Sequence, residues 1–260
     1  MRSVVLFVDL LRMQLVARGQ YRADFLTGVA ASILQHMATL GTLWLIFAQV
    51  PALGGWNVAQ AAVLYGFFSL TLGLTNFLAS GLRDLPTMVR QGELDGFLVQ
   101  PASAYVQLLP RLNLNAISDV VVSLTVLLGA SQSAGVRWTL PVAAYALLAL
   151  ICGTAIFLGF LTAVYSISFF SPYPGLMAGL EGLTQMARFP AGIYPRWLQV
   201  IMTWVFPVAF TGHFPAAVLT GAEAVPWWTA LAGLGLAAAA LGAGASMWRW
   251  GLSRYEGAGN

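Results

Sequence analysis

The sequence predicts an all-α membrane protein with six transmembrane helices, and three observations support this fold class. Hydrophobic residues make up 59% of the 260 residues and charged residues only 8%, whereas soluble domains are about half apolar and about a quarter charged. Several apolar stretches exceed the roughly 18 residues that a helix needs to cross a bilayer. The short alternating segments of a membrane barrel are absent. Because backbone groups in lipid must be paired internally, we expect the apolar stretches to be helices.

Composition also excludes several chemistries. The chain has no lysine, so it lacks the Gly-Lys-Ser/Thr ending of a phosphate-binding loop. No Cys/His group has the spacing of a metal site, and no Gly-x-Ser-x-Gly or His-Glu-x-x-His motif is present. No basic stripe with interleaved aromatic residues indicates nucleic-acid binding. We therefore expect a protein that is not itself an enzyme and that holds no metal, nucleic acid or cofactor.

Apolar runs separated by polar or Pro/Gly-rich segments define a single transmembrane domain over residues 1–260. Residues 1–24 are predicted to form an interfacial helix, since Asp9 and Arg12 interrupt the apolar run that a signal peptide would need. Pro51, Gly54 and Gly55 mark a turn after the first span. Five of the spans are predicted at 25–50, 58–82, 105–130, 140–170 and 227–248.

The proline-rich region 171–221 leaves two interpretations open. In the first, a fifth span covers 174–189 and a partly inserted helix–break–helix segment covers 190–221; such breaks at membrane depth need protein or water around them. In the second, the fifth span is 197–219 and 171–190 lies on the membrane surface. Candidate residues of the broken region are Pro190, Pro195, Arg196, Trp197, Pro207 and Pro215.

Arginine counts orient the chain. With both termini and the segment 83–101 in the cytoplasm, eight of the twelve basic residues lie inside and three outside, as cytoplasmic loops are enriched in arginine. Trp56, Trp138, Trp197, Trp227 and Trp228 would then lie near the outer interface.

Residues 83–101 form a charged island between two membrane-length segments. Pro86 can begin a helix, and the island is too apolar for a simple linker. It is predicted to be either a short amphipathic helix that docks into a partner or an interfacial loop whose apolar side rests on lipid headgroups. The residues singled out here are Arg90, Gly92, Glu93, Leu94, Asp95, Phe97, Leu98 and Pro101.

Polar residues inside the predicted spans are a second group of candidates. Arg111, Asn115 and Asp119 are spaced by four and share one stripe of the third span, and Glu181 lies in the proposed fifth helix. An ionisable residue within a span costs about 2.5–3.5 kcal/mol on insertion scales and therefore usually faces protein or water. Structural pairing and substrate contact are both open for these residues. His36 and His213 are expected to be hydrogen-bonded helix residues.

Several segments carry a resemblance to a known family. They are Y-R-A-D-F (21–25), G-G-W (54–56), R-Q-G-E-L-D-G-F-L-V-Q-P (90–101), Arg111 with Asp119, R-F-P-A-G-I-Y-P-R-W-L (188–198), F-P-V-A-F (206–210) and F-P-A-A-V-L-T-G (214–221). On these residues the chain resembles the membrane (permease) subunit of type-2 ATP-binding-cassette (ABC) exporters, in a bacterial branch of permeases.

The resemblance implies six spans, an N-terminal interfacial helix, a re-entrant extracellular hairpin within 190–221 and a cytoplasmic coupling loop at 83–103. It implies two permeases, identical or different, assembled with two ABC ATPase subunits that bind ATP and Mg in the bacterial cytoplasmic (inner) membrane. Gly92 would then end or kink the coupling helix. Glu93 and Asp95 would pair with basic groups of the ATPase, and Leu94, Phe97 and Leu98 would fill its groove. Pro101 would separate this element from the third span.

Two other functions are alternatives. An ion-coupled secondary transporter would predict inverted repeats, and no internal repeat is found in the sequence. A non-transporting membrane scaffold is not excluded by the sequence. The substrate is not defined, although a lining rich in Phe, Trp, Leu and Met suits amphipathic or lipophilic molecules.

Overall fold

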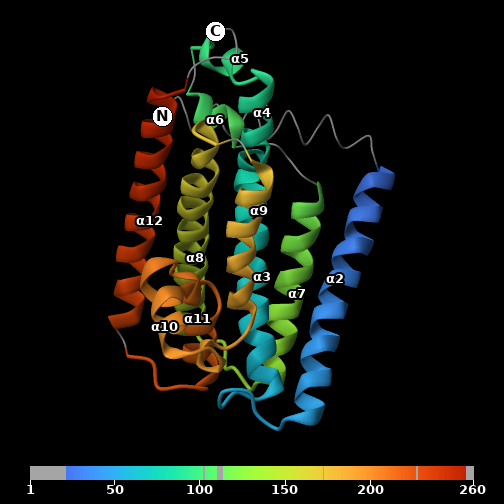
Figure 1. The fold of residues 1–260 in the computed structure, drawn as a ribbon. Coiled ribbons are helices and arrows are strands. Elements are labelled where there is room, and N and C mark those ends of the chain that lie inside the picture. The colour runs from blue at the N-terminus through green and yellow to red at the C-terminus, as the bar shows by residue number, and fades with distance from the viewer. Residues whose placement is uncertain (1–21, 102, 110–113, 172, 227, 256–260) are drawn as a thin grey trace.

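The computed structural model describes residues 22–101, 103–109, 114–171, 173–226 and 228–255 (Figure 1). Within these residues the fold is helical, with one isolated bridge between Leu53 and Trp56. Five helices are long and apolar enough to cross a membrane, and they lie side by side in Figure 1. They are α2 (Arg22–Gln49), α3 (Val58–Ala79), α7 (Leu114–Ser133), α8 (Leu140–Ser166) and α12 (Trp228–Ser253).

These helices confirm the first, second, fourth and last predicted spans to within a few residues. The predicted interfacial helix 1–24 lies outside the described residues except for 22–24, which belong to α2. The predicted third span is interrupted near its start, because the short helix α6 (Ala104–Leu108) ends before Leu109. Helix α7 follows and is described from Leu114 on.

The island folds into two short helices where one was predicted. After η1 (Ser80–Asp84), α4 (Leu85–Gln91) begins with Pro86 in its first turn and ends at Gly92, whose φ of +71° is the left-handed conformation that glycine adopts freely. The amide of Glu93 then bonds to the carbonyl of Met88 at 3.0 Å, which closes the helix end. A second turn, α5 (Asp95–Leu98), follows.

The region 171–221 contains only short helices. After η2 (Ile167–Phe169), they are α9 (Pro174–Gly182), η3 (Leu183–Arg188), η4 (Ala191–Ile193), α10 (Arg196–Val200), η5 (Ile201–Val205), η6 (Val208–Thr211) and α11 (His213–Thr220). In Figure 1, α9 runs along the bundle, whereas α10 and α11 lie at the end opposite α4 and α5.

This arrangement contradicts the second interpretation, a continuous span over 197–219. The helix is interrupted at Phe206–Pro207, where proline has no amide to donate, and again at Gly212, where a Cβ would approach the carbonyl oxygen of Leu64 to 3.1 Å. Helices α9 and η3 together follow the predicted fifth helix 174–189 but are shorter than the five candidate spans. The sixth span and the re-entrant hairpin therefore stay predictions.

Helices α8 and α12 form the most intimate contact of the bundle. A Cβ added at Gly244 would lie 2.6 Å from the carbonyl oxygen of Gly159, and one added at Gly159 would overlap the backbone of Ala240. The two backbones therefore approach as closely as small residues permit, a common way to pair helices in lipid. Helix α2, in contrast, exposes large apolar side chains along its length, including Leu34 (66% exposed), Met37 (64%) and Trp44 (64%).

Candidate functional site

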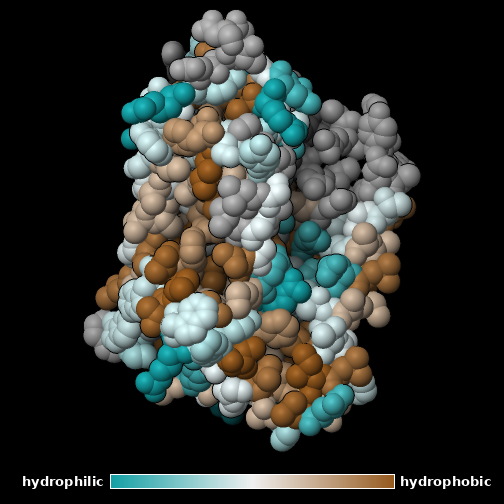
Figure 2. Space-filling model, viewed as in Figure 1, coloured by the Kyte–Doolittle hydropathy of each residue, from teal (hydrophilic) through white to brown (hydrophobic). Residues whose placement is uncertain are grey.

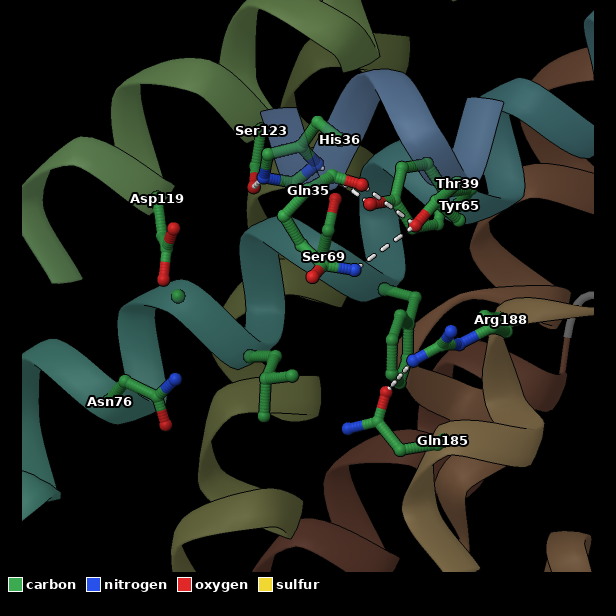
Figure 3. Close-up of a pocket in the computed structure, with 13 residues that line it drawn as sticks. Gln35, His36, Thr39, Tyr65, Ser69, Asn76, Asp119, Ser123, Gln185 and Arg188 are labelled. Atoms are coloured by element: carbon green, nitrogen blue, oxygen red, sulfur yellow. Dashed lines mark hydrogen bonds between the residues drawn. The ribbon is translucent and has the colours of Figure 1, made fainter. Parts of the chain in front are cut away.

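A polar cavity of about 310 Å³ lies among α2, α3, α7 and η3. Its polar lining residues are Gln35, His36, Thr39, Tyr65, Ser69, Asn76, Asp119, Ser123, Gln185 and Arg188 (Figure 3). On the surface, hydrophilic side chains gather about halfway along the bundle between α9 and α2, with hydrophobic side chains beyond them (Figure 2). Ionisable groups at such a depth need protein or water around them, so this cavity is the main candidate for a functional site.

His36 joins three of the cavity's helices. Its Nδ1 lies 2.7 Å from the hydroxyl of Tyr65 in α3, and its Nε2 lies 3.3 Å from the hydroxyl of Ser123 in α7. One turn away on α2, the hydroxyl of Ser32 donates to Asp119 at 2.5 Å. These contacts fit the expectation that His36 is a hydrogen-bonded helix residue. They also mean that polar contacts inside the cavity help to hold α2 against the bundle.

Opposite charges stand on different sides of the cavity. Asp119 projects from α7 on the side of Asn76, and Arg188 projects from η3 beside Gln185, to which it donates a hydrogen bond (Figure 3). Two buried atoms of the lining have no hydrogen-bond partner among the described residues, namely Nε of Arg188 and Oδ1 of Asn76. Such atoms usually have a partner in folded proteins, so the cavity has unused binding capacity.

The predicted polar residues of the spans are only partly brought together. Asp119 lines the cavity, but Glu181 does not. Arg111 lies outside the described residues, as does the side chain of Asn115. Four lining residues had no predicted role: Tyr65, Asn76, Gln185 and Arg188. The signal that could have indicated them is a set of polar residues at one depth on different helices.

Glu181 instead forms an ion pair near the island. The Nε of Arg83 donates to both carboxylate oxygens at 3.1 and 3.2 Å, and a second guanidinium nitrogen also contacts the carboxylate. The hydroxyl of Tyr165 in α8 donates to Oε2 at 2.7 Å. The side chains of Arg83 and Glu181 are 30% and 18% exposed. This pair connects η1, at the start of the island, to α9.

The island presents one exposed face and packs the other against the bundle. Arg90, Glu93, Leu98, Val99 and Pro101 are exposed, and Gly92 and Phe97 are partly buried.

The expected contact surface of the island is wrong at Leu94. Its side chain is fully buried in a core with Leu82, Leu85 and Met88, so it supports the island and is not available to fill a partner's groove. Asp95 lies beside Tyr255, and burial together with this carboxylate raises the pKa of the Tyr255 hydroxyl.

A third polar group lies at the opposite end of the molecule. Glu223, which the sequence analysis did not single out, accepts from the indole N–H of Trp56 at 2.6 Å, and its other oxygen lies 3.4 Å from Nε2 of His213. The amide of Ala191 donates to Nδ1 of His213 at 3.3 Å, so Nε2 carries the imidazole proton that faces the carboxylate. His213 and Trp56 hold the pKa of Glu223 below its usual value, against the opposing effect of burial.

The prolines of the broken region 190–221 lie at or near the starts of its short helices. Pro190, Pro195 and Pro207 directly precede η4, α10 and η6, and Pro215 lies within the first turn of α11. Arg196 and Trp197 are exposed.

The fold and cavity define a multi-pass helical membrane protein with a charged helical loop at one end of its bundle. Residues 33–259 match the family model described as ABC-2 family transporter protein, so the chain belongs to this family and is an ABC transporter permease subunit. Comparison with curated proteins gave no match, and comparison with solved structures gave none.

Proposed function

We propose that the chain is the permease subunit of an ATP-driven exporter and that its polar cavity is part of the translocation pathway. The observation that carries this proposal is the cavity itself, which places Asp119, His36 and Arg188 at mid-depth among helices that otherwise have apolar surfaces. Such residues are expensive in lipid and mark transport pathways in many membrane proteins. Membership of the family supports the assignment.

A second permease, identical or different, would cover the face of α2. The outer face of this helix is apolar and exposed, and its Leu34 and Met37 lie in the same stretch as the cavity residues Gln35, His36 and Thr39. A second subunit placed here would enclose the polar hollow of Figure 2 between two chains. The pathway would then run along the subunit boundary.

The exposed face of the island would contact a separate ATPase, which binds ATP and Mg. Leu98 is 41% exposed and Val99 is 84% exposed, and the charged residues Arg90 and Glu93 of the same island are also exposed. Apolar anchors with a charged surround fit a helix that docks into a groove. The acids would set the register, and the apolar side chains would supply affinity.

The Arg83–Glu181 pair offers a mechanical route from this loop to the cavity. Arg83 precedes α4 and holds α9, whose helical continuation η3 places Gln185 and Arg188 at the cavity. Movement of the island would therefore displace one wall of the cavity. In this proposal α9 and η3 form the fifth of six spans, 190–221 is the re-entrant extracellular region, and both termini lie on the cytoplasmic side of a bacterial inner membrane.

Co-purification tests the proposal directly. A tagged permease, expressed from its native genomic region and extracted in mild detergent, should bring down an ABC ATPase in stoichiometric amount. Leu98→Asp should abolish this association, whereas Leu140→Asp should retain it; Leu140 is an 84%-exposed leucine at the start of α8, at the other end of the bundle. Recovery of the permease without an ATPase, or equal association of both variants, would contradict the proposal.

One observation favours an ion-coupled secondary transporter as the second candidate. The side chains of Asp119 and His36 are both part of the cavity lining, and such groups can carry protons or ions across a membrane. Transport that follows a proton or sodium gradient without ATP would support this alternative. A non-transporting scaffold is distinguished by an associated ATPase whose rate no transported compound changes.

A further inference from the structure

The two charges of the cavity are held apart although they share one space. Asp119 and Arg188 form no ion pair within 4.0 Å among the described residues, and Figure 3 shows them on different sides of the cavity with Ser69 and Gln35 between. Opposite charges in a weakly screened interior attract strongly. Keeping them separate at this depth therefore suits a ligand that bridges them.

Each end of the cavity selects for one kind of group. At one end, the carboxylate of Asp119 and the unpartnered Oδ1 of Asn76 are both acceptors and therefore favour an ammonium group. At the other end, the unpartnered Nε of Arg188 is a charged donor and favours a phosphate or carboxylate. Gln185 already accepts from Arg188, so it orients the guanidinium without neutralising it.

Size and surroundings limit the ligand further. A volume of about 310 Å³ is at the low end of the roughly 300–1,000 Å³ of ligand pockets, so it accommodates a head group and not a long chain. Phe68 and Leu72 supply apolar walls, and the outer surface of α2 next to the cavity carries exposed Leu34 and Met37. An apolar tail attached to the head group can lie along this surface.

We propose that the cavity binds a zwitterionic head group, with its amine at Asp119 and its phosphate or carboxylate at Arg188. The ligand is an amphiphile whose tail stays outside the cavity. This inference rests on the proposed function, because it names the class of substrate for the same pathway.

The test measures binding to the purified permease, with its ATPase if one co-purifies, in nanodiscs of phosphatidylglycerol, so that the bilayer supplies no zwitterion. Three probes share one fluorescent acyl chain: lysophosphatidylethanolamine, which is zwitterionic, lysophosphatidic acid, which is anionic, and the corresponding alkylamine, which is cationic. Empty nanodiscs give the background. The zwitterion should bind about tenfold more tightly than either singly charged probe, because it gains one extra charge-assisted contact.

Two variants should lose selectivity in opposite directions. Arg188→Gln should bind the zwitterion no better than the alkylamine, and Asp119→Asn should bind it no better than the anionic probe. Arg188→Lys, which keeps the charge, should retain part of the preference. The matched control is Arg196→Gln, at an exposed arginine outside the cavity, and it should bind as wild type.

Several outcomes overturn the inference. The first is equal affinity for the three probes. The second is an unchanged preference for the zwitterion in correctly folded Arg188→Gln and Asp119→Asn. The third is loss of the permease dimer in Arg188→Gln, because Arg188 would then bind the partner subunit and not a ligand. A second experiment uses free phosphoethanolamine as a competitor of the fluorescent lysophosphatidylethanolamine. If it competes as well as the unlabelled lysolipid, the ligand is a soluble zwitterion and not an amphiphile. Failure of ATPase co-purification would overturn the proposed function alone, since binding is measured on the permease itself.

Discussion

Arg83 and Glu181, which are 98 positions apart in the sequence, meet in a two-pronged ion pair with Nε–O distances of 3.1 and 3.2 Å. The hydroxyl of Tyr165 holds the same carboxylate at 2.7 Å. Because the pair is partly buried and each residue lies on a different element, it fixes the start of the island relative to α9. A bidentate arginine–carboxylate pair also has defined geometry, which a mechanical connection requires.

Removing one partner should separate binding of the ATPase from transmission of its motion. We expect Arg83→Gln to retain the ATPase in co-purification but to lose transport and stimulated ATPase activity. Stability should fall by about 1–3 kcal/mol, because the carboxylate is left without its charged donor. Thermal unfolding in detergent and transport in vesicles measure the two effects. The exchanged pair Arg83→Glu with Glu181→Arg is the control; if it restores nothing, the ion pair is not the connection.

Gly242 and Gly244 of α12 should respond differently to substitution by alanine. At Gly244 a Cβ would lie 2.6 Å from the carbonyl oxygen of Gly159, whereas at Gly242 it would meet nothing within 4 Å. Gly244→Ala should therefore destabilise the protein by about 1–3 kcal/mol through overpacking. Gly242→Ala should be neutral or stabilising by up to about 1 kcal/mol. Melting temperatures of the two variants in one detergent compare them directly, and equal values would contradict the close contact.

Leu94 and Val99 test the division of the island into a buried and an exposed side. Leu94 is 0% exposed and Val99 is 84% exposed. Leu94→Ala should cost about 2–5 kcal/mol, as other buried leucines do, while Val99→Ala should leave the melting temperature unchanged. For ATPase binding, compared between correctly folded proteins, the order of the two variants should be the reverse: Val99→Ala should weaken the association more than Leu94→Ala. A stable Leu94→Ala protein would show that this core is not formed.

The Glu223 cluster predicts a dependence of stability on pH. Its pKa is lowered in the folded state by His213 and Trp56, so the folded protein binds fewer protons than the unfolded chain. The ionised carboxylate of Glu223 therefore contributes fully to the stability of the fold above its unfolded pKa of about 4.5. This contribution is lost as the pH falls through the lower pKa of the folded state. Wild type should be more stable than Glu223→Gln at pH 7, and the difference should shrink below about pH 4.5. Thermal unfolding of both proteins across this range is the measurement. A constant difference would exclude the ionised carboxylate as the cause.

Most of the fold could be predicted from the lengths of the apolar stretches and from the glycines and prolines between them, because these features act on the neighbouring backbone. Gly92 ends α4 as expected, since a left-handed residue at a helix end is a property of the backbone alone. The interruption after α6 was not predicted, because Leu109 lies in a largely apolar stretch and hydropathy alone does not show where a helix ends. One of the two interpretations of 171–221 predicted a broken helix where Pro207 and Gly212 lie. The close approach of Gly212 to Leu64 and Phe68 of α3 was not predicted.

The site was harder to predict because it depends on how the helices are rotated against one another. Asp119 was identified from its charge, but its meeting with Ser32 and its shared cavity with Arg188 require the packing of four separate elements. Pairing was one of two roles left open for Glu181, and nothing in the sequence indicates Arg83 as its partner. Trp56, which was expected near the outer interface, is completely buried within the protein, because His213 of the segment 190–221 packs against it and Glu223 binds its indole.

The interlocked glycines of α8 and α12 divide the molecule into a stationary and a movable part. Two helices whose backbones touch at Gly159 and Gly244 cannot slide or rotate past each other without a collision. Helix α2 meets no such obstacle in the described residues, since its large apolar side chains are exposed and a Cβ added at Gly41 would meet nothing within 4 Å. We expect any change in access to the cavity to displace this wall while α8 and α12 act as the fixed frame. Distance measurements between spin labels on α2 and α12 should therefore change during ATP turnover, whereas those between α8 and α12 should not.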